Sequence, residues 1–465
     1  MKISLTIASL LALLAVAPDS NAVDAGPQLP AYRRVTLTNG LTLLLMEQHK
    51  VPMIAYEALV KAGSVADPVG QEGLAALTAQ MLEKGTDRHT ADQIATNLDF
   101  TGGSMHISCN PDYAAIRGDF LKKDSDTLLS LVAEILERPA FPAVELKKLV
   151  RLEIDEIKSE KEAARSVLPL YFDGWLFGSH PYGRPVDGDE RSLVKLKSKA
   201  LTAFYHDYYG PETTVLTLVG DFDSQAIERL VAEKFGPWKN LGRQGSKPPV
   251  IAEPMKGRTL LLVDKPDSTQ TYFAIGNLGV ARNNADRTGI QIVNLLFGGR
   301  FTSMLNEALR VNSGLTYGIR SGFTMHLAPG PFAITSFTRN ATTTKALDMT
   351  LDILEKLHRE GVSEDQLNSA KNYLKGQFPP QIETPGQLAG LLAEFELFGL
   401  NAREVNGLFQ RIDAFSTTDA KRIIQQYFPR ENLSFVLIGK ASEIEESVKK
   451  YAPKMEKRLI DQPGF

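Results

Sequence analysis

The segment from Gly73 to Thr86, GLAALTAQMLEKGT, has the spacing of a hydrolytic metal motif without its chemical groups. In an inverted zinc motif, H-x-x-E-H, two imidazoles four residues apart share one helix face and hold the metal. The glutamate beside them activates a bound water. The three corresponding positions here are Ala76, Ala79 and Gln80. Because a methyl group neither binds a metal nor moves a proton, this segment predicts no zinc site of its own.

The segment must also form the element that would position such groups. Leu74, Leu77, Met81 and Leu82 recur at helical spacing, which predicts an amphipathic helix that opens after a glycine turn and packs this face inward.

Two stretches of the first half resemble the pitrilysin/insulinase family of zinc metallopeptidases. In PVGQEGLAALTAQMLEKGT, residues 68–86, Gly-Leu-Ala and Lys-Gly-Thr stand where the family has them around its zinc motif. The segment His180–Asp223, which begins HPYGRP, is similar to the family's His-Pro-Tyr-Gly segment. The resemblance implies that the family's histidines fall on Ala76 and Gln80, and its catalytic glutamate on Ala79. His180, beside a proline, is interpreted as a structural loop residue.

The resemblance also assigns the family's third zinc ligand, a glutamate on a later helix. This ligand falls on Glu156, within RLEIDEIKSE, whereas the family's supporting glutamate seven residues earlier falls on Leu149. A catalytic zinc ordinarily keeps three protein ligands and a water. Glu156 is therefore a vestigial ligand position, expected to be a solvated or hydrogen-bonded helix residue, and this chain is expected to bind no metal.

The second half carries residues that the resemblance marks as functional. RFTSMLNEALRVNSGLTYGIRSGFT predicts a helix over about 302–310, a turn at Gly314 and a strand through Tyr317. It resembles the family's Leu-Arg-x-x-x-Gly-Leu-x-Tyr segment, which implies that Arg310 and Tyr317 hold and polarise a substrate peptide opposite a zinc. The alternatives are an Arg310 that complements a helix C-terminus and a Tyr317 packed in a core.

Other catalytic chemistries find little support in the sequence. The seven histidines are scattered singly, no G-x-S-x-G turn occurs, and the sole cysteine, Cys109, has no sign of an activated thiolate. A formal net charge of −3 gives no electrostatic footprint for nucleic acid.

The N-terminus predicts export. Lys2 precedes an apolar run over residues 3–17, and Ser20-Asn21-Ala22 has the small-x-small pattern of a signal-peptidase site. We expect residues 1–22 to be a cleaved signal peptide and the protein to be periplasmic or secreted, with no membrane span after cleavage.

The chain looks duplicated, and its 465 residues are too many for one ordinary domain. Gly220 matches Gly439 at the end of an apolar run, and Glu134–Glu145 resembles Asp352–Glu364 at nearly the same offset. The boundaries predicted are a first domain over 33–235, a linker over 236–257 and a second domain over 258–455. We expect an α+β fold of two homologous domains, each a mainly antiparallel sheet with helices on one face, forming a clam-like shell.

The resemblance extends to function, because the family includes heteromeric members in which only one subunit bears the zinc motif. It implies that this chain is the metal-free subunit of a heterodimeric zinc peptidase, with zinc held by a homologous partner carrying H-x-x-E-H and with unfolded peptides as substrates. The alternative is a non-catalytic binding or scaffold protein that kept only the shell.

Overall fold

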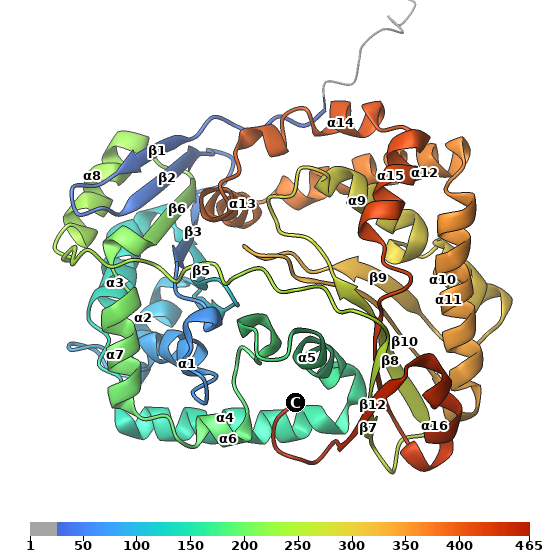
Figure 1. Ribbon diagram of the computed structural model, residues 1–465. Helices are drawn as coiled ribbons and strands as arrows, with labels where there is room; N and C mark the ends of the chain where they lie inside the picture. Colours follow the sequence, from blue (N-terminus) through green and yellow to red (C-terminus); the bar gives the residue numbers. More distant parts are fainter. Residues whose placement is uncertain (1–25) are drawn as a thin grey trace, which may run out of the picture.

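The computed structural model describes residues 26–465 (Figure 1). The signal peptide expected over residues 1–22 lies outside the described residues. Two six-stranded sheets, one from each half of the chain, are surrounded by helices. The expected α+β fold is confirmed. The sheets are mixed, because each combines antiparallel pairs with at least one parallel pair.

The first sheet begins with a hairpin that turns around Asn39-Gly40. Gly40 has φ +95°, a left-handed conformation that glycine adopts without a steric penalty, and the strands on either side pair antiparallel. The strand order across the sheet is β1 (Arg33–Thr36), β2 (Thr42–Glu47), β6 (Thr214–Gly220), β3 (Met53–Val60), β5 (Ala114–Leu121), β4 (His106–Cys109).

The second sheet repeats the first in five of its six strands. Its order is β12 (Lys454–Leu459), β7 (Thr259–Asp264), β11 (Ser434–Gly439), β8 (Gln270–Leu278), β10 (Pro331–Arg339), β9 (Ile319–Phe323). The outermost position differs, since β1 pairs antiparallel with β2 whereas β12 pairs parallel with β7. Gly220 and Gly439 end the equivalent strands β6 and β11, so the internal repeat is confirmed.

Helices of each half cover the outer face of its own sheet. Those of the first half are α1 (Leu74–Met81), α2 (Ala91–Thr101), α3 (Ser125–Glu137), α4 (Ala143–Glu162), α6 (Glu190–Leu193), α7 (Ser198–Tyr208) and α8 (Ser224–Phe235). Those of the second half are α9 (Arg287–Asn294), α10 (Met304–Asn306), α11 (Thr343–Glu360), α15 (Thr417–Tyr427) and α16 (Ala441–Val448). Two more helices, α12 (Glu364–Gln377) and α14 (Leu408–Ala414), pack against α9 and each other.

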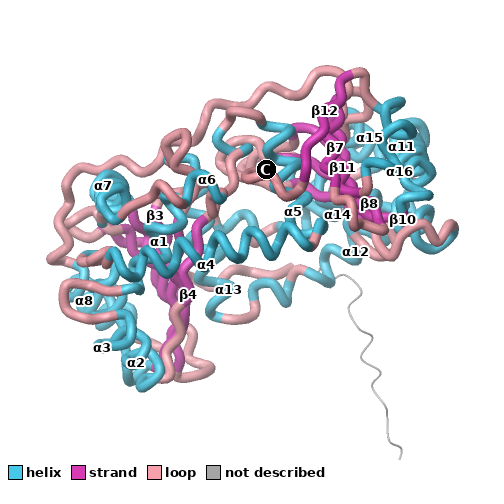
Figure 2. Tube along the Cα trace, turned by 90° about the horizontal axis from the view of Figure 1, so that it is seen from below, coloured by secondary structure: helices cyan, strands magenta, loops and turns pink. Residues whose placement is uncertain are grey.

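The inner face of each sheet is covered by a helix from the other half. In β2, Leu43 and Leu45 face the helices of the first half, whereas Leu44 and Met46 pack against α13 (Pro385–Phe398) of the second half. In the second sheet, α5 (Ala164–Phe177) of the first half packs across β8 and β11. Figure 2 shows α5 and α13 between the two sheets. Helices therefore lie on both faces of each sheet, not on one as predicted.

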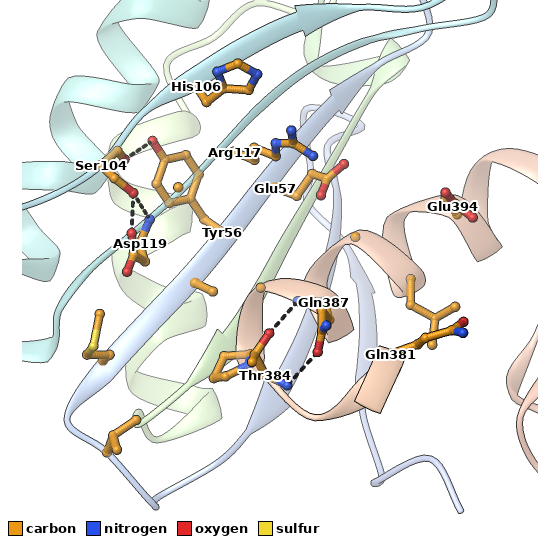
Figure 3. A pocket seen from close by; sticks show the side chains of 18 of the residues that line it. Tyr56, Glu57, Ser104, His106, Arg117, Asp119, Gln381, Thr384, Gln387 and Glu394 are labelled. Carbon is orange, nitrogen blue, oxygen red and sulfur yellow. Dashed lines mark hydrogen bonds between the residues drawn. The ribbon is translucent and has the colours of Figure 1, made fainter. Parts of the chain in front are cut away.

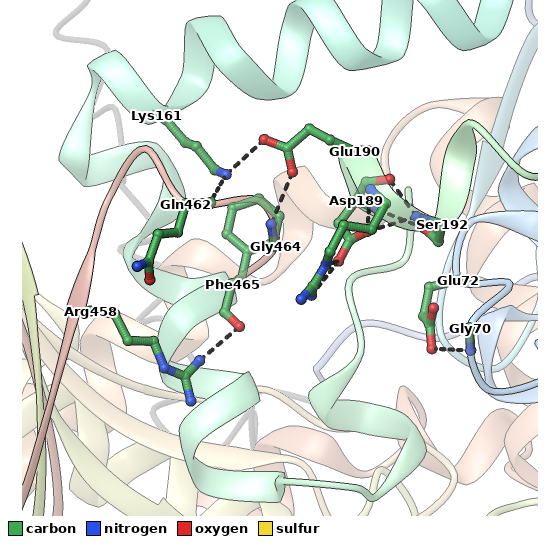
Figure 4. Close-up of polar contacts among 11 residues, drawn as sticks. Gly70, Glu72, Lys161, Asp189, Glu190, Ser192, Arg458, Gln462, Gly464 and Phe465 are labelled. Atoms are coloured by element: carbon green, nitrogen blue, oxygen red, sulfur yellow. Dashed lines mark hydrogen bonds and ion pairs between the residues drawn. The ribbon is translucent and has the colours of Figure 1, made fainter.

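Two further segments link the halves. Residues 236–257 contain no helix or strand, and Ser246 donates to the Lys61 carbonyl while Met255 donates to the Asn277 side chain. The segment after β12 returns to the first half, where the Lys161 ammonium donates to Glu190 and to the Gln462 carbonyl (Figure 4). No helix in the described part of the chain is both long and apolar enough to cross a membrane.

Candidate functional site

Helix α1 begins at a buried carboxylate. Gly73 precedes it with φ +91°, and Asp67 accepts hydrogen bonds from the backbone N–H groups of Gly73 (2.9 Å) and Ala75 (2.8 Å). Burial raises the pKa of Asp67 to about 7, although these two bonds oppose the rise. The loop containing HPYGRP supports this corner, since the Arg184 guanidinium donates to the Asp67 carbonyl.

The three motif positions lie on a helix that is buried on nearly every side. Leu74, Leu77, Met81 and Leu82 face the core as predicted. However, Ala76 and Ala79 are only 1% and 0% exposed. The prediction of an amphipathic helix is therefore wrong, because the helix is buried on more than one face. Gln80 alone is partly accessible. Closely packed methyl groups occupy two of the three positions where metal-binding or proton-transferring side chains would be needed.

Acidic side chains from α4 and from the loop before α6 gather beside Gln80. Burial raises the pKa of Glu153 to about 7, and the nearby charges of Asp187 and Glu156 add to the rise, while a hydrogen bond from Gln80 opposes it. Glu156 itself is exposed on α4. Sequence reasoning missed Glu153, one turn before Glu156, although their spacing places both on one side of a helix.

These residues do not fit a zinc ion. Between residues 26 and 465, no group of three or more histidine, cysteine, aspartate or glutamate side chains is arranged to hold a metal. Leu149, the position to which the sequence resemblance assigns a supporting glutamate, is buried. Both ring nitrogens of His180 are engaged by backbone, at Val250 and Tyr182. Burial raises the pKa of the Cys109 thiol, which disfavours a nucleophilic thiolate.

Arg310 and Tyr317 lie on either side of a turn in the second half. Helix α10 continues as a π-helix over Glu307–Asn312, which carries Arg310, and Gly314 turns the chain with φ +61°. The predicted strand begins at Ile319, so Tyr317 precedes it and does not belong to it. The Tyr317 side chain is 83% exposed, which excludes the alternative of a core residue.

The loop that carries Tyr317 is fixed by Asn306, which sequence reasoning missed. The Asn306 side-chain amide donates to the Ile319 carbonyl (2.7 Å), and its oxygen accepts from the Ile319 N–H (3.3 Å). This pair of bonds ties the helix to β9 on both sides of the turn. In the sequence, the only signal for this tie is an asparagine within a predicted helix that is followed by a turn and a strand.

A cavity of about 470 Å³ brings Arg310 and Tyr317 together. It lies between the first turns of α5 and the inner face of the second sheet, and we call it the arginine pocket because Arg165, Arg300, Arg310 and Arg320 line it. The Arg310 guanidinium lies 4.4 Å from the centre of the Phe301 ring, a cation–π contact. None of Ala76, Ala79, Gln80 or Glu156 lines this pocket, so the structure does not join the two predicted sites within one chain.

A larger cavity, about 790 Å³, occupies the equivalent place in the first half. It lies between the inner face of the first sheet and α13 (Figure 3). Its wall carries both charges, with Glu57, Asp119 and Glu394 beside Arg117 and Arg282. Burial raises the pKa of Glu57, although the Arg117 charge opposes the rise.

Two sequence models of one peptidase family match the chain. The model described as "Insulinase (Peptidase family M16)" matches residues 43–184, and the one described as "Peptidase M16 inactive domain" matches residues 195–374. The two matches fall in succession on the first half and on the part of the chain that includes Arg310 and Tyr317.

Relatives and solved structures of similar length agree with these matches. An uncharacterized zinc protease of Mycobacterium leprae is 26% identical over 412 residues, 88% of this chain and 92% of that protein. The uncharacterized zinc protease YmxG of Bacillus subtilis is 23% identical over 408 residues, 88% of this chain and 98% of that protein. The crystal structure of a peptidase M16 inactive domain from Pseudomonas fluorescens superposes with a TM-score of 0.83 at 24% identity, covering 88% of this chain and 98% of that one. A protease from Helicobacter pylori superposes with a TM-score of 0.82 at 21% identity, covering 88% and 100%.

Proposed function

Because the chain belongs to the insulinase family of peptidases, peptidase M16, we propose that it is the metal-free subunit of an exported heterodimeric zinc peptidase. A homologous partner with an intact H-x-x-E-H motif supplies the zinc and the general base. This chain supplies Arg310 and Tyr317. The observation that carries the proposal is the accessible Arg310–Tyr317 pair in a pocket, in a chain whose own motif positions are alanine and glutamine.

The pair suits the charge that develops when a peptide bond is hydrolysed. Attack on the carbonyl produces an oxyanion, which positioned hydrogen-bond donors stabilise. The Tyr317 hydroxyl has no hydrogen-bond partner among the described residues and is free to donate. The Arg310 side chain is held by its contact with Phe301, and its N–H groups form no ion pair within residues 26–465, so they are available to peptide carbonyls.

The substrates in this proposal are extended peptides. The pocket lies next to β9, the outermost strand of the second sheet, and an extended segment can pair with such an edge where a folded protein cannot. The N-terminal apolar run supports the export that we propose. After signal cleavage the subunit would meet its partner and its substrates in the periplasm or outside the cell.

The test is reconstitution with a homologous H-x-x-E-H subunit. The isolated chain should be inactive, and the mixture should cleave an unfolded peptide. Tyr317→Phe in the mixture should lower kcat about 100-fold, the scale seen when one oxyanion donor is removed, and Arg310→Ala should also lower it. Tyr32→Phe and Arg229→Ala, outside the arginine pocket, are matched controls.

Two results would reject the proposal. One is full peptidase activity of the isolated chain, and the other is unchanged activity of the mixture with both pocket variants. If instead the variants alter only the assembly of the two subunits and not turnover, the chain is a binding or scaffold protein that has abandoned catalysis.

A further inference from the structure

The arginine pocket has a charge that nothing in the described structure balances. Four guanidinium groups line it, and no aspartate or glutamate does. None of the four arginines forms an ion pair within residues 26–465, where 31 salt bridges connect other side chains. Since the whole chain carries a formal charge of −3, this local excess of positive charge does not reflect its composition.

The arginines are positioned by contacts that leave their charge uncompensated. Arg300 donates to the Ser369 hydroxyl (3.1 Å) and lies over the Tyr373 ring, while its buried Nε has no partner among residues 26–465. Within the described part of the chain, Arg320 donates only to the Thr335 hydroxyl. Neutral partners and aromatic rings fix a guanidinium without neutralising it, so several N–H donors remain free for an anion.

The equivalent cavity in the first half provides an internal comparison. It lies between the first sheet and α13, a helix of the second half, just as the arginine pocket lies between the second sheet and α5, a helix of the first half. Its arginines, Arg117 and Arg282, share the wall with three carboxylates. Arg282 is paired with Glu394 at 3.1 Å. The repeat alone therefore does not produce a wall whose charged side chains are all arginine, and the two cavities differ in charge.

We propose that the arginine pocket binds the carboxylate of an acidic peptide. Guanidinium groups bind carboxylates through paired, charge-assisted hydrogen bonds, which are stronger than neutral ones. A volume of about 470 Å³ admits a side chain or a chain end with its neighbouring residues, and the Tyr272 and Phe337 rings offer apolar contact. Resting on the proposed function, this inference names its substrate class: peptides with a carboxylate near the bond held by Arg310 and Tyr317.

The carboxylate has two possible sources, an Asp or Glu side chain and the free C-terminus of the peptide. The experiment measures binding to the full chain, without a partner, by fluorescence anisotropy. Four labelled ten-residue peptides share one unfolded sequence, with two Glu or two Gln at its centre and with a free or an amidated C-terminus. Titrations at 50 and 300 mM NaCl report the electrostatic share of the affinity.

A side-chain carboxylate predicts that the amidated Glu peptide binds about tenfold more tightly than the amidated Gln peptide. A terminal carboxylate predicts the same preference for the free over the amidated Gln peptide. Either preference should weaken at 300 mM NaCl. Arg165 and Arg320 are exposed pocket arginines outside the proposed catalytic pair. Arg165→Gln and Arg320→Gln should each reduce the preference for the carboxylate peptide severalfold. Arg229 is exposed on α8, and Arg229→Gln should leave the preference for the carboxylate peptide unchanged.

Equal affinity for all four peptides would overturn the inference, as would an undiminished preference in both pocket variants that retain the wild-type melting temperature. The two proposals fail separately, because binding is measured without the partner. Lost carboxylate preference with active mixtures refutes only the substrate class. Retained preference with inactive mixtures refutes only the subunit role.

Discussion

At the scale of single residues, packing limits which side chains fit on helix α1. Ala79 lies in the main core of the first half, and Ala76 beside it is equally inaccessible. A carboxylate or an imidazole at these positions would need space that surrounding side chains now fill. The core is therefore closed around these two small side chains.

A glutamate at position 79 should accordingly destabilise the protein. Ala79→Glu would bury a carboxylate without a partner, and we expect it to lower the free energy of unfolding by at least about 3 kcal/mol. Urea denaturation measures the change. Ala95→Glu, on the exposed surface of α2, is the matched control and should stay within about 0.5 kcal/mol. An Ala79→Glu variant as stable as wild type would show that the position opens to solvent.

The sequence could predict the residues of the candidate site only where they lie close along the chain. Arg310 and Tyr317 are seven positions apart, and both line one pocket. Arg165 lines the same pocket from the other half of the chain, because α5 crosses to the second sheet. No local pattern reports such a long-range contact.

At the scale of elements, α4 places its carboxyl groups against one another. Glu153, Glu156 and Glu160 occupy successive turns facing Asp187, and burial together with these charges raises the pKa of Glu153 to about 7. A folded-state pKa above the unfolded value of 4.5 means that folding favours the protonated form. The contribution of protonated Glu153 to the free energy of unfolding is fully present below pH 4.5 and is lost as the pH rises through 7.

Glu153→Gln should therefore stabilise the protein in a pH-dependent manner. The amide resembles the protonated acid, so the variant should melt above wild type at pH 8, and the difference should vanish near pH 4.5. Thermal melts monitored by circular dichroism at five pH values provide the measurement. Asp155→Asn, on the exposed side of the same helix, is the control and should show no such trend. A difference that is equal at all pH values would contradict the assignment.

The elements themselves were largely predictable, but their partners were not. The β2 sequence TLLLME and the β7 sequence TLLLVD are apolar at consecutive positions, which indicates strands buried on both faces. Such a run does not identify what covers each face. Whether α5 packs on the second sheet and α13 on the first depends on the path of the whole chain. The sequence pattern of either helix is equally compatible with packing on its own half.

At the scale of the whole molecule, a buried ion pair fastens the end of the second half to the first. Lys161 is 6% exposed and donates to Glu190, which also accepts from the Gly464 N–H (Figure 4). Although burial opposes it, the bond from Lys161 lowers the pKa of Glu190. A lowered carboxyl pKa contributes stability that is present above the unfolded value of 4.5 and lost as the pH falls.

Lys161→Met should remove this contribution. We expect a loss of about 3 kcal/mol at pH 7, because the variant leaves Glu190 without its charged partner, and a smaller loss near pH 4, where that carboxyl is protonated in the unfolded state. Chemical denaturation at the two pH values measures both. Lys148→Met, exposed on the same helix and paired with Glu145, should cost at most about 1 kcal/mol.

Because α5 and α13 each pack on the sheet of the other half, the stability of each half depends on the other. Leu392 of α13 is buried against the first sheet, although α13 belongs to the second half. If the first half unfolded alone, α13 would expose its apolar side, and α5 would leave the second sheet. Two domains with small interfaces often unfold separately, but here each separate step exposes a sheet face in both halves. We therefore expect a single calorimetric transition.

Two leucine variants test this coupling. Leu392→Ala removes packing from the first sheet, and Leu354→Ala removes packing within the second half's own core. Each should cost about 2–5 kcal/mol. If the halves are coupled, both variants shift the same single transition to lower temperature and leave the calorimetric and van't Hoff enthalpies equal. Independent halves would instead give two transitions, of which each variant moves only one, and α5 and α13 would then be docked too weakly to join the two sheets into one cooperative unit.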